Sequence, residues 1–306
     1  MTLIYVKANC HCGLNNFQIP ILTSTLPQGF DMCHCNACRH ITGQMFLHVV
    51  LMDGPPLSVD SGLTPDTHEP ADLSTLSMCK ASDKVLRYFC PRCFAHILYD
   101  LHQPNQLHTW AVSSGAMERA EGLVKTGYHI FVPDTLDGGV ADHVRYLNGK
   151  EMARYMGWEG SKQVPIGWKS ESLSISASTE EERLHAYCHC KQISLYLTRP
   201  KNDLGQSKQE QNPGTEPRFI AGHCFCTSCR LTSGSLFVTY IDVPLRNIFD
   251  ANKGQAIQII SAKEVSTTLG GLKAWCNMSA LLVEFENLAV LAVRMYSRIR
   301  ATRLKY

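Results

Sequence analysis

The feature that most constrains this chain is a cysteine cluster that occurs twice. Residues 33–39 and 224–230 both read C-x-C-x-x-C-R, and a glycine (Gly43, Gly234) follows each arginine four positions later. A C-H-C segment lies upstream of each cluster, at residues 10–12 and 188–190. Packing alone does not explain three thiols within six residues, and the repeated order indicates a duplicated domain. The sequence therefore predicts two related metal-binding domains whose chemistry depends on the metal.

Composition narrows the class of protein. A length of 306 residues is enough for two domains, each with its own core. The formal net charge of +2 gives no electrostatic case for a nucleic-acid or membrane partner, and no apolar run approaches membrane-spanning length. The first residues are too short an apolar run for a secretory signal. We expect a cytoplasmic protein, with the nucleus as the alternative, and in that reducing setting metal explains the 14 cysteines better than disulfides do.

The repeat also sets the domain boundaries. Residues 169–183 are serine-rich and then acidic, which is typical of a flexible linker. We expect a first domain at residues 1–160, a linker at 161–183 and a second domain at 184–306. The polar segment 201–217, rich in Gly, Pro and Gln, is expected to be a surface loop.

Secondary structure is expected to be mainly β. Several runs of β-branched and aromatic residues are bounded by turn residues and predict strands, namely 46–51, 85–89, 236–241 and 257–260. The best helical candidate is residues 141–154. The economical interpretation is a small β-rich zinc domain built twice.

Four cysteines of the first copy predict a closed site. A C-x-C on a strand presents both thiols on one face, because side chains alternate with a period of two. A C-x-x-C around a tight turn brings two sulfurs to one metal. Cys10, Cys12, Cys90 and Cys93 therefore complete a tetrahedron of thiolates. Such a site has no place for a substrate, so we expect it to hold a structural zinc.

Cys33, Cys35 and Cys38 predict a different kind of site. Three thiolates on a tetrahedral zinc leave one position open, which is typical of a catalytic metal. The ion is then a weak Lewis acid, better suited to a soft ligand such as a substrate thiol. Arg39 and Arg230 follow the two clusters, and each could offset the negative charge, hold a substrate carboxylate or form a structural ion pair.

The second copy is expected to be incomplete. Cys224, Cys226 and Cys229 are candidate zinc ligands, but Cys188 and Cys190 have no C-x-x-C partner later in the chain and form half of a structural site. The histidines inside the clusters point away from the thiol face of a strand, so ligation by them is the less favoured alternative. Cys79 and Cys276 lie outside any cluster and are expected to be small buried hydrophobic residues.

The order C-H-C, then C-H-C-x-x-C-R-x-x-x-G, then Phe89-Cys90-Pro91-Arg92-Cys93 resembles the family of glutathione-dependent formaldehyde-activating enzymes, which includes centromere protein V. The resemblance spans about residues 5–135. It implies two tandem β-tent domains related to the Mss4-like proteins, a structural zinc on Cys10, Cys12, Cys90 and Cys93, and a catalytic zinc on Cys33, Cys35 and Cys38. It also implies carbon–sulfur lyase chemistry of the S-(hydroxymethyl)glutathione synthase kind.

The chain departs from the family pattern at a few positions. Phe94 stands where the family usually has glycine after the second C-x-x-C, Lys191 stands where the first copy has Gly13, and Phe225 stands where it has His34. One frame over, the codons of residues 287–297 can encode C-x-x-C-G-A-N-V-F, the motif that the second copy lacks. We hypothesise a frameshift or a mis-spliced gene model here, which sequencing of the transcript would settle.

The sequence thus predicts a zinc-dependent, carbon–sulfur lyase-like enzyme acting on a small thiol adduct, with a small-molecule thiol such as glutathione as its partner. The alternative is a non-catalytic zinc scaffold of the same fold that binds a protein or a polynucleotide. The physiological thiol, the activity of the second domain and the oligomeric state do not follow from the sequence.

Overall fold

The computed structural model describes most of the chain. The described residues are 2–59, 69–101, 108–118, 122–147, 149–171, 183–191, 193–198, 219–251 and 254, and three short segments at 282–285, 288–290 and 293–296. The fold is mainly β, which confirms the predicted class. Among these residues, no helix is long and apolar enough to cross a membrane. The codons discussed above lie in a segment whose side chains are outside the described residues.

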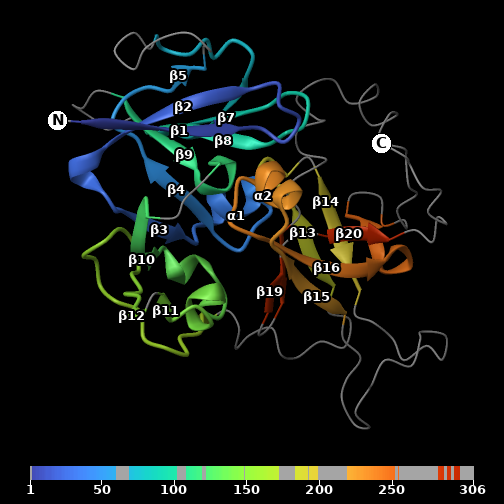
Figure 1. Cartoon of the computed structure of the whole chain (residues 1–306). Helices are drawn as coiled ribbons and strands as arrows, with labels where there is room; N and C mark the ends of the chain where they lie inside the picture. Colours follow the sequence, from blue (N-terminus) through green and yellow to red (C-terminus); the bar gives the residue numbers. More distant parts are fainter. Residues whose placement is uncertain are drawn as a thin grey trace.

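The N-terminal part (residues 1–160) is built on a seven-stranded sheet with the strand order β10-β3-β4-β9-β8-β7-β6, and on a three-stranded sheet with the order β1-β2-β5 (Figure 1). The strands of the larger sheet are β3 (Gln28–Cys33), β4 (Leu47–Leu51), β6 (Ser77–Ser82), β7 (Val85–Phe89), β8 (His96–Leu101), β9 (Thr109–Ser113) and β10 (Val124–Ile130). Those of the smaller sheet are β1 (Leu3–Asn9), β2 (Asn16–Leu22) and β5 (Leu57–Ser58).

The core of the N-terminal part lies between these two sheets. β2 alternates as a half-buried strand does, so that Phe17 and Ile19 face inward. They pack against Val50 of β4 and Val112 of β9. Cys10 and Cys90 belong to the same buried cluster, so the first cysteine site is set into the wall of this core.

The C-terminal part (residues 184–306) has a five-stranded sheet with the order β17-β14-β13-β18-β19 and a three-stranded sheet with the order β15-β16-β20 (Figure 1). Their strands are β13 (Leu184–Tyr187), β14 (Ser194–Leu197), β15 (Ile220–Cys224), β16 (Val238–Pro244), β17 (Ile248–Asp250), β18 (Leu282–Phe285), β19 (Leu288–Val290) and β20 (Val293–Tyr296). In the part of the chain that the structure describes, no sheet mixes strands from the two parts.

Two short helices, α1 (Asn36–Thr42) and α2 (Thr227–Ser233), are built alike. In α1 the Cys35 sulfur accepts a hydrogen bond from the first turn, and in α2 the Cys226 sulfur does the same. Gly43 and Gly234 end the two helices in the left-handed conformation. The glycine four residues after each arginine is therefore a helix cap. Shorter 3-10 turns are η1 (Thr23–Thr25), η3 (Ser114–Ala116), η4 (Val132–Asp134), η5 (Gly139–Asp142) and η8 (Leu245–Asn247).

The two parts meet backbone to backbone. The Gly115 N–H donates to the Gly234 carbonyl oxygen at 3.0 Å. A Cβ atom added to Gly115 would lie 2.4 Å from the Ser235 carbonyl oxygen, so only glycine fits there. Phe46 and Phe237, each three residues after its helix-capping glycine, meet edge to face with ring centroids 5.5 Å apart. Equivalent positions of the two copies thus face each other across this contact.

The strand predictions are confirmed for β4, β7 and β16, while residues 257–260 and 201–217 lie outside the described residues. The predicted helix at 141–154 is wrong. That segment holds the end of η5 and a hairpin of β11 (Tyr146–Leu147) and β12 (Lys150–Glu151). Asn148-Gly149 is a hairpin-turn sequence, and Gly149 has a positive φ of 74°. The turn chemistry outweighed a weak helical pattern.

Acid should destabilise the fold through His129. This buried imidazole lies 2.9 Å from the His34 ring and 2.8 Å from the Val144 carbonyl oxygen. Burial lowers the pKa of His129 from 6.5 to about 4. The unfolded chain therefore takes up a proton as the pH falls through about 6.5, whereas the folded chain does so only near 4, and stability is lost over that window by about 3 kcal/mol. Urea unfolding of wild type and His129→Gln at pH 7.5 and 5.0 measures this. An equal loss of stability in both proteins would contradict it.

Candidate metal centres

The first site unites the four predicted cysteines. The sulfurs of Cys10, Cys12, Cys90 and Cys93 all lie within 4.8 Å of one another. Cys12 Sγ is 3.6 Å from Cys10 Sγ and 3.7 Å from Cys90 Sγ. A disulfide requires about 2.05 Å, whereas a tetrahedral zinc with sulfurs at about 2.3 Å holds them about 3.8 Å apart. The donor set and its spacing therefore fit one zinc ion with four thiolate ligands.

Local turns explain how the sequence builds this site. Gly13 has a φ of 72°, and the Asn15 N–H donates to Cys10 Sγ at 3.3 Å. On the other side Phe94 also adopts a positive φ, of 58°, and its N–H donates to the Cys90 carbonyl oxygen at 2.9 Å. Glycine is the residue that adopts this conformation without a steric cost. The departure at Phe94 therefore preserves the turn and leaves strain in the backbone.

Hydrogen bonding prepares one thiol of this site to ionise. Burial disfavours the thiolate of Cys12, but hydrogen bonds from the Leu14 backbone and from the neighbouring cysteines outweigh it and lower its pKa to about 7. Burial raises the pKa of Cys10 instead. The group thus gives up a first proton near neutral pH, as a metal ligand must.

The second site unites Cys33, Cys35 and Cys38, whose sulfurs also lie within 4.8 Å of one another. Cys33 ends β3, Cys35 caps α1 and Cys38 lies in its first turn, where only 7% of the residue is exposed. Hydrogen bonds from Cys33 and Cys35, reinforced by Arg87, hold the pKa of Cys38 well below its usual range. The thiolate negative charge of this cluster is therefore concentrated at Cys38.

Arg87 of β7 is a functional candidate that sequence reasoning missed. Its Nη2 donates to Cys38 Sγ at 3.2 Å, and its guanidinium carbon lies 5.2 Å from the centre of the Tyr99 ring. The residue is 3% exposed, so its charge is buried beside the thiolate. The available signal was its register. Arg87 shares the inward face of a strand with Phe89, and an inward arginine requires a partner.

Removing this guanidinium should weaken the second site. In Arg87→Leu the Cys38 thiolate loses its buried counter-charge, which costs about 3–5 kcal/mol of folding stability. We also expect zinc affinity to fall about 10–100-fold, as for other partners of metal ligands. Urea unfolding and competition with a chromophoric chelator measure the two effects. Arg87→Lys keeps the charge and should lose less of both. If Arg87→Leu binds zinc as tightly as wild type does, Arg87 has no role at the site.

Arg39 and Arg230 do not face the thiolates. Arg39 is fully buried (0% exposed); its Nε donates to the His34 carbonyl oxygen at 2.9 Å and its Nη2 to the Asp134 carbonyl oxygen at 2.6 Å. Arg230 Nη1 donates to the Gly115 carbonyl oxygen at 3.0 Å, across the contact between the two parts. These contacts favour a structural role for both arginines over the alternative of a substrate ligand, with carbonyl oxygens in place of the predicted ion pair.

The histidines between the cysteines differ in their surroundings. His34 Nε2 lies 2.9 Å from His129 Nδ1, and its ring packs against Phe46, whereas Cys33 and Cys35 pack with the cluster that contains Tyr99. His34 therefore points away from the thiols, as the alternation predicts. His11 and His189 are exposed on their turns.

The third site lies in the C-terminal part. Cys224, Cys226 and Cys229 gather within 4.8 Å, and Cys226 is exposed, so this cluster is more open to solvent than the second site. Cys188 Sγ and Cys190 Sγ lie 3.5 Å apart. Whether they form half a site stays a prediction, because Cys276 and residues 287–297 are not among the side chains that the structure describes. Cys79 lies half-buried on β6, outside the clusters.

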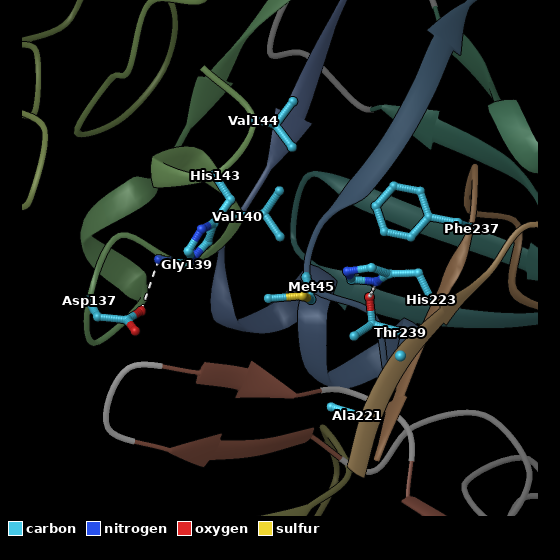
Figure 2. Close-up of a pocket in the computed structure, with 11 residues that line it drawn as sticks. Met45, Asp137, Gly139, Val140, His143, Val144, Ala221, His223, Phe237 and Thr239 are labelled. Atoms are coloured by element: carbon cyan, nitrogen blue, oxygen red, sulfur yellow. Dashed lines mark hydrogen bonds between the residues drawn. The ribbon is translucent and has the colours of Figure 1, made fainter. Parts of the chain in front are cut away.

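A pocket of about 330 Å³ lies between the two parts (Figure 2). Met45 and Val140 line it from the N-terminal part, and His223, Phe237 and Thr239 line it from β15 and β16. The pocket borders the face of residues 33–35 that carries His34, because a Cβ on its lining residue Gly139 would lie 3.9 Å from His34 Nδ1. It is therefore separate from the thiol face of the second site.

Residues 5–134 match the family model described as glutathione-dependent formaldehyde-activating enzyme. No curated protein matches the chain significantly. The match confirms the resemblance of the N-terminal part and supports a function related to glutathione and formaldehyde. It stops before the second copy, so the duplication stays a prediction.

Proposed function

Because residues 5–134 belong to that family, we propose that the chain is a zinc-dependent carbon–sulfur lyase-type enzyme. It joins formaldehyde to a small thiol of the glutathione kind. The observation that supports this most is the cluster of Cys33, Cys35 and Cys38 with the Arg87 guanidinium against it. The cluster offers three thiolate ligands, and a tetrahedral metal needs four.

The two sites of the N-terminal part divide the work. Cys10, Cys12, Cys90 and Cys93 would hold a structural zinc, since four thiolates complete its coordination. Cys33, Cys35 and Cys38 would hold the catalytic zinc, which, when bound, supplies a position where a substrate thiol ionises more readily.

The protein's own groups set the charge at the second site. Three thiolates and a divalent ion sum to one negative charge, which would repel a further thiolate. Arg87 places a buried positive charge against Cys38 and offsets that repulsion. In the reaction the thiol sulfur bonds to the carbon of formaldehyde, and the thiol proton passes to the aldehyde oxygen. Nothing is oxidised or reduced, so the residues need only to position and to balance charge.

The assay uses the full chain with glutathione and formaldehyde. We expect formation of S-(hydroxymethyl)glutathione above the spontaneous rate, a loss of that excess after chelation, and its return when zinc is restored. A fully zinc-loaded, folded protein that does not exceed the spontaneous rate would refute the proposal. That result would favour the alternative, a non-catalytic zinc scaffold.

A further inference from the structure

A segment of the C-terminal part reaches the second site. The helix α1, which carries Cys38, is joined to the end of β13 by a contact 2.9 Å long between His40 Nδ1 and the Tyr187 carbonyl oxygen. The two rings also stack, with centroids 4.2 Å apart and an interplanar angle of 20°. The His40 side chain is buried in this contact. Residues 187–191, which include the second C-H-C, are therefore fixed against the helix of the first copy's cluster.

His189 lies within electrostatic range of that cluster. Burial lowers the pKa of its imidazole, and the Arg87 guanidinium lowers it further, while the sulfurs of Cys188 and Cys38 oppose the shift. A histidine of the C-terminal part thus responds to the charges of the N-terminal site. His189 is nevertheless exposed, so it is within reach of a dissolved molecule.

Lys191 adds a second exposed cation to the same segment. Its ammonium nitrogen lies 5.6 Å from the centre of the Tyr187 ring, the ring that stacks on His40. Its backbone is in the left-handed region, with a φ of 57°, at the position where the first copy has Gly13. The turns match otherwise, since Lys191 N–H donates to the Cys188 carbonyl oxygen at 2.8 Å. A lysine held in a conformation suited to glycine is a strained residue, and such strain concentrates at functional positions.

The cations of the N-terminal part cannot easily serve a dissolved carboxylate. Arg39 and Arg87 are 0% and 3% exposed and donate to protein atoms. A substrate that approaches Cys38 from solvent would meet His189 and Lys191 first.

We propose that residues 187–191 form the carboxylate-binding end of the substrate site built on Cys33, Cys35 and Cys38, with Lys191 and His189 as its cationic groups. The ligand class is a small thiol with carboxylates. The two parts of the chain then share one site, in which the first supplies the thiolates and the second supplies selectivity for anionic thiols. This inference rests on the proposed function.

The test compares an anionic and an uncharged thiol. Lys191→Gly removes the ammonium and restores the residue of the first copy, so the variant is expected to fold. With formaldehyde in excess, we expect the KM for glutathione to rise about tenfold, the effect of one lost charge-assisted hydrogen bond. The KM for 2-mercaptoethanol, the kcat for both thiols and the zinc content should stay unchanged. His189→Gln should act in the same direction, and Lys162→Gly, which removes an exposed lysine elsewhere, should leave both KM values unchanged.

The outcomes separate the two proposals. If wild type turns over and Lys191→Gly keeps the wild-type KM for glutathione, the shared site is refuted while the proposed function stands. If wild type does not turn over, calorimetric titration of zinc-loaded wild type and Lys191→Gly with glutathione replaces the kinetic readout. Weaker binding by the variant then supports the shared site, and equal or absent binding overturns it.

Discussion

Replacing Cys90 by serine should unfold the N-terminal part. Cys90 is 0% exposed, packs in the main core cluster and lies with its sulfur 3.7 Å from that of Cys12. A structural zinc contributes about 10–16 kcal/mol in zinc-finger peptides. The whole stability of a domain is about 5–15 kcal/mol. Losing the ion therefore removes more free energy than the fold has in reserve.

Circular dichroism, urea unfolding and zinc content of the purified variant measure this effect. The matched control is Cys79→Ser, which changes a half-buried cysteine on β6 outside the clusters and should keep both its fold and its zinc. A folded Cys90→Ser protein with the zinc content of wild type would show that the first site is not needed for folding.

Replacing Cys38 by serine should abolish turnover while the fold remains. The first site is untouched by this change, and α1 keeps its cap at Cys35 and its glycine end at Gly43. The second site, however, loses the sulfur that Arg87 contacts at 3.2 Å. We expect kcat/KM for glutathione and formaldehyde to fall by more than about 100-fold, because even outer partners of metal ligands cost about 10–100-fold.

The repeat supplies the control for this variant. Cys229 holds the corresponding position in α2, and Cys229→Ser should retain the activity if the N-terminal site carries the reaction. The measurements are turnover, zinc content and the urea midpoint of both variants. Equal losses in the two proteins would assign the reaction to both copies. Full activity in Cys38→Ser, with one zinc fewer, would remove the catalytic assignment.

Spacing alone was sufficient to predict the cysteine clusters. The C-x-C and C-x-x-C patterns act within one strand or one turn, so they bring Cys33, Cys35 and Cys38 together whatever the rest of the fold does. Joining Cys10 to Cys90 needed only the assumption that both pairs serve one tetrahedral ion. The glycine after each cluster had a local cause too, as the left-handed end of a short helix.

Long-range pairing was beyond the sequence. Arg87 reaches Cys38 because β7 lies over α1 in the folded sheet, which no local pattern specifies. The contact of His40 with Tyr187 depends on how the two parts meet. The helix predicted at 141–154 failed for the opposite reason, since a local turn signal at Gly149 was present and was outweighed in the prediction by an apolar period.

The contact between Gly115 and Gly234 has a consequence for any attempt to study one copy by itself. An expressed fragment ending near residue 160 would leave the Gly115 backbone donor and the Phe46 ring without the partners that they have in the whole chain. Such a fragment would present a sticky, glycine-lined notch shaped to receive a helix end like α2. Its own α1 has the same form. A truncated protein is thus a different molecular object, inclined to pair with copies of itself, and its activity would report on that pairing as much as on the native site.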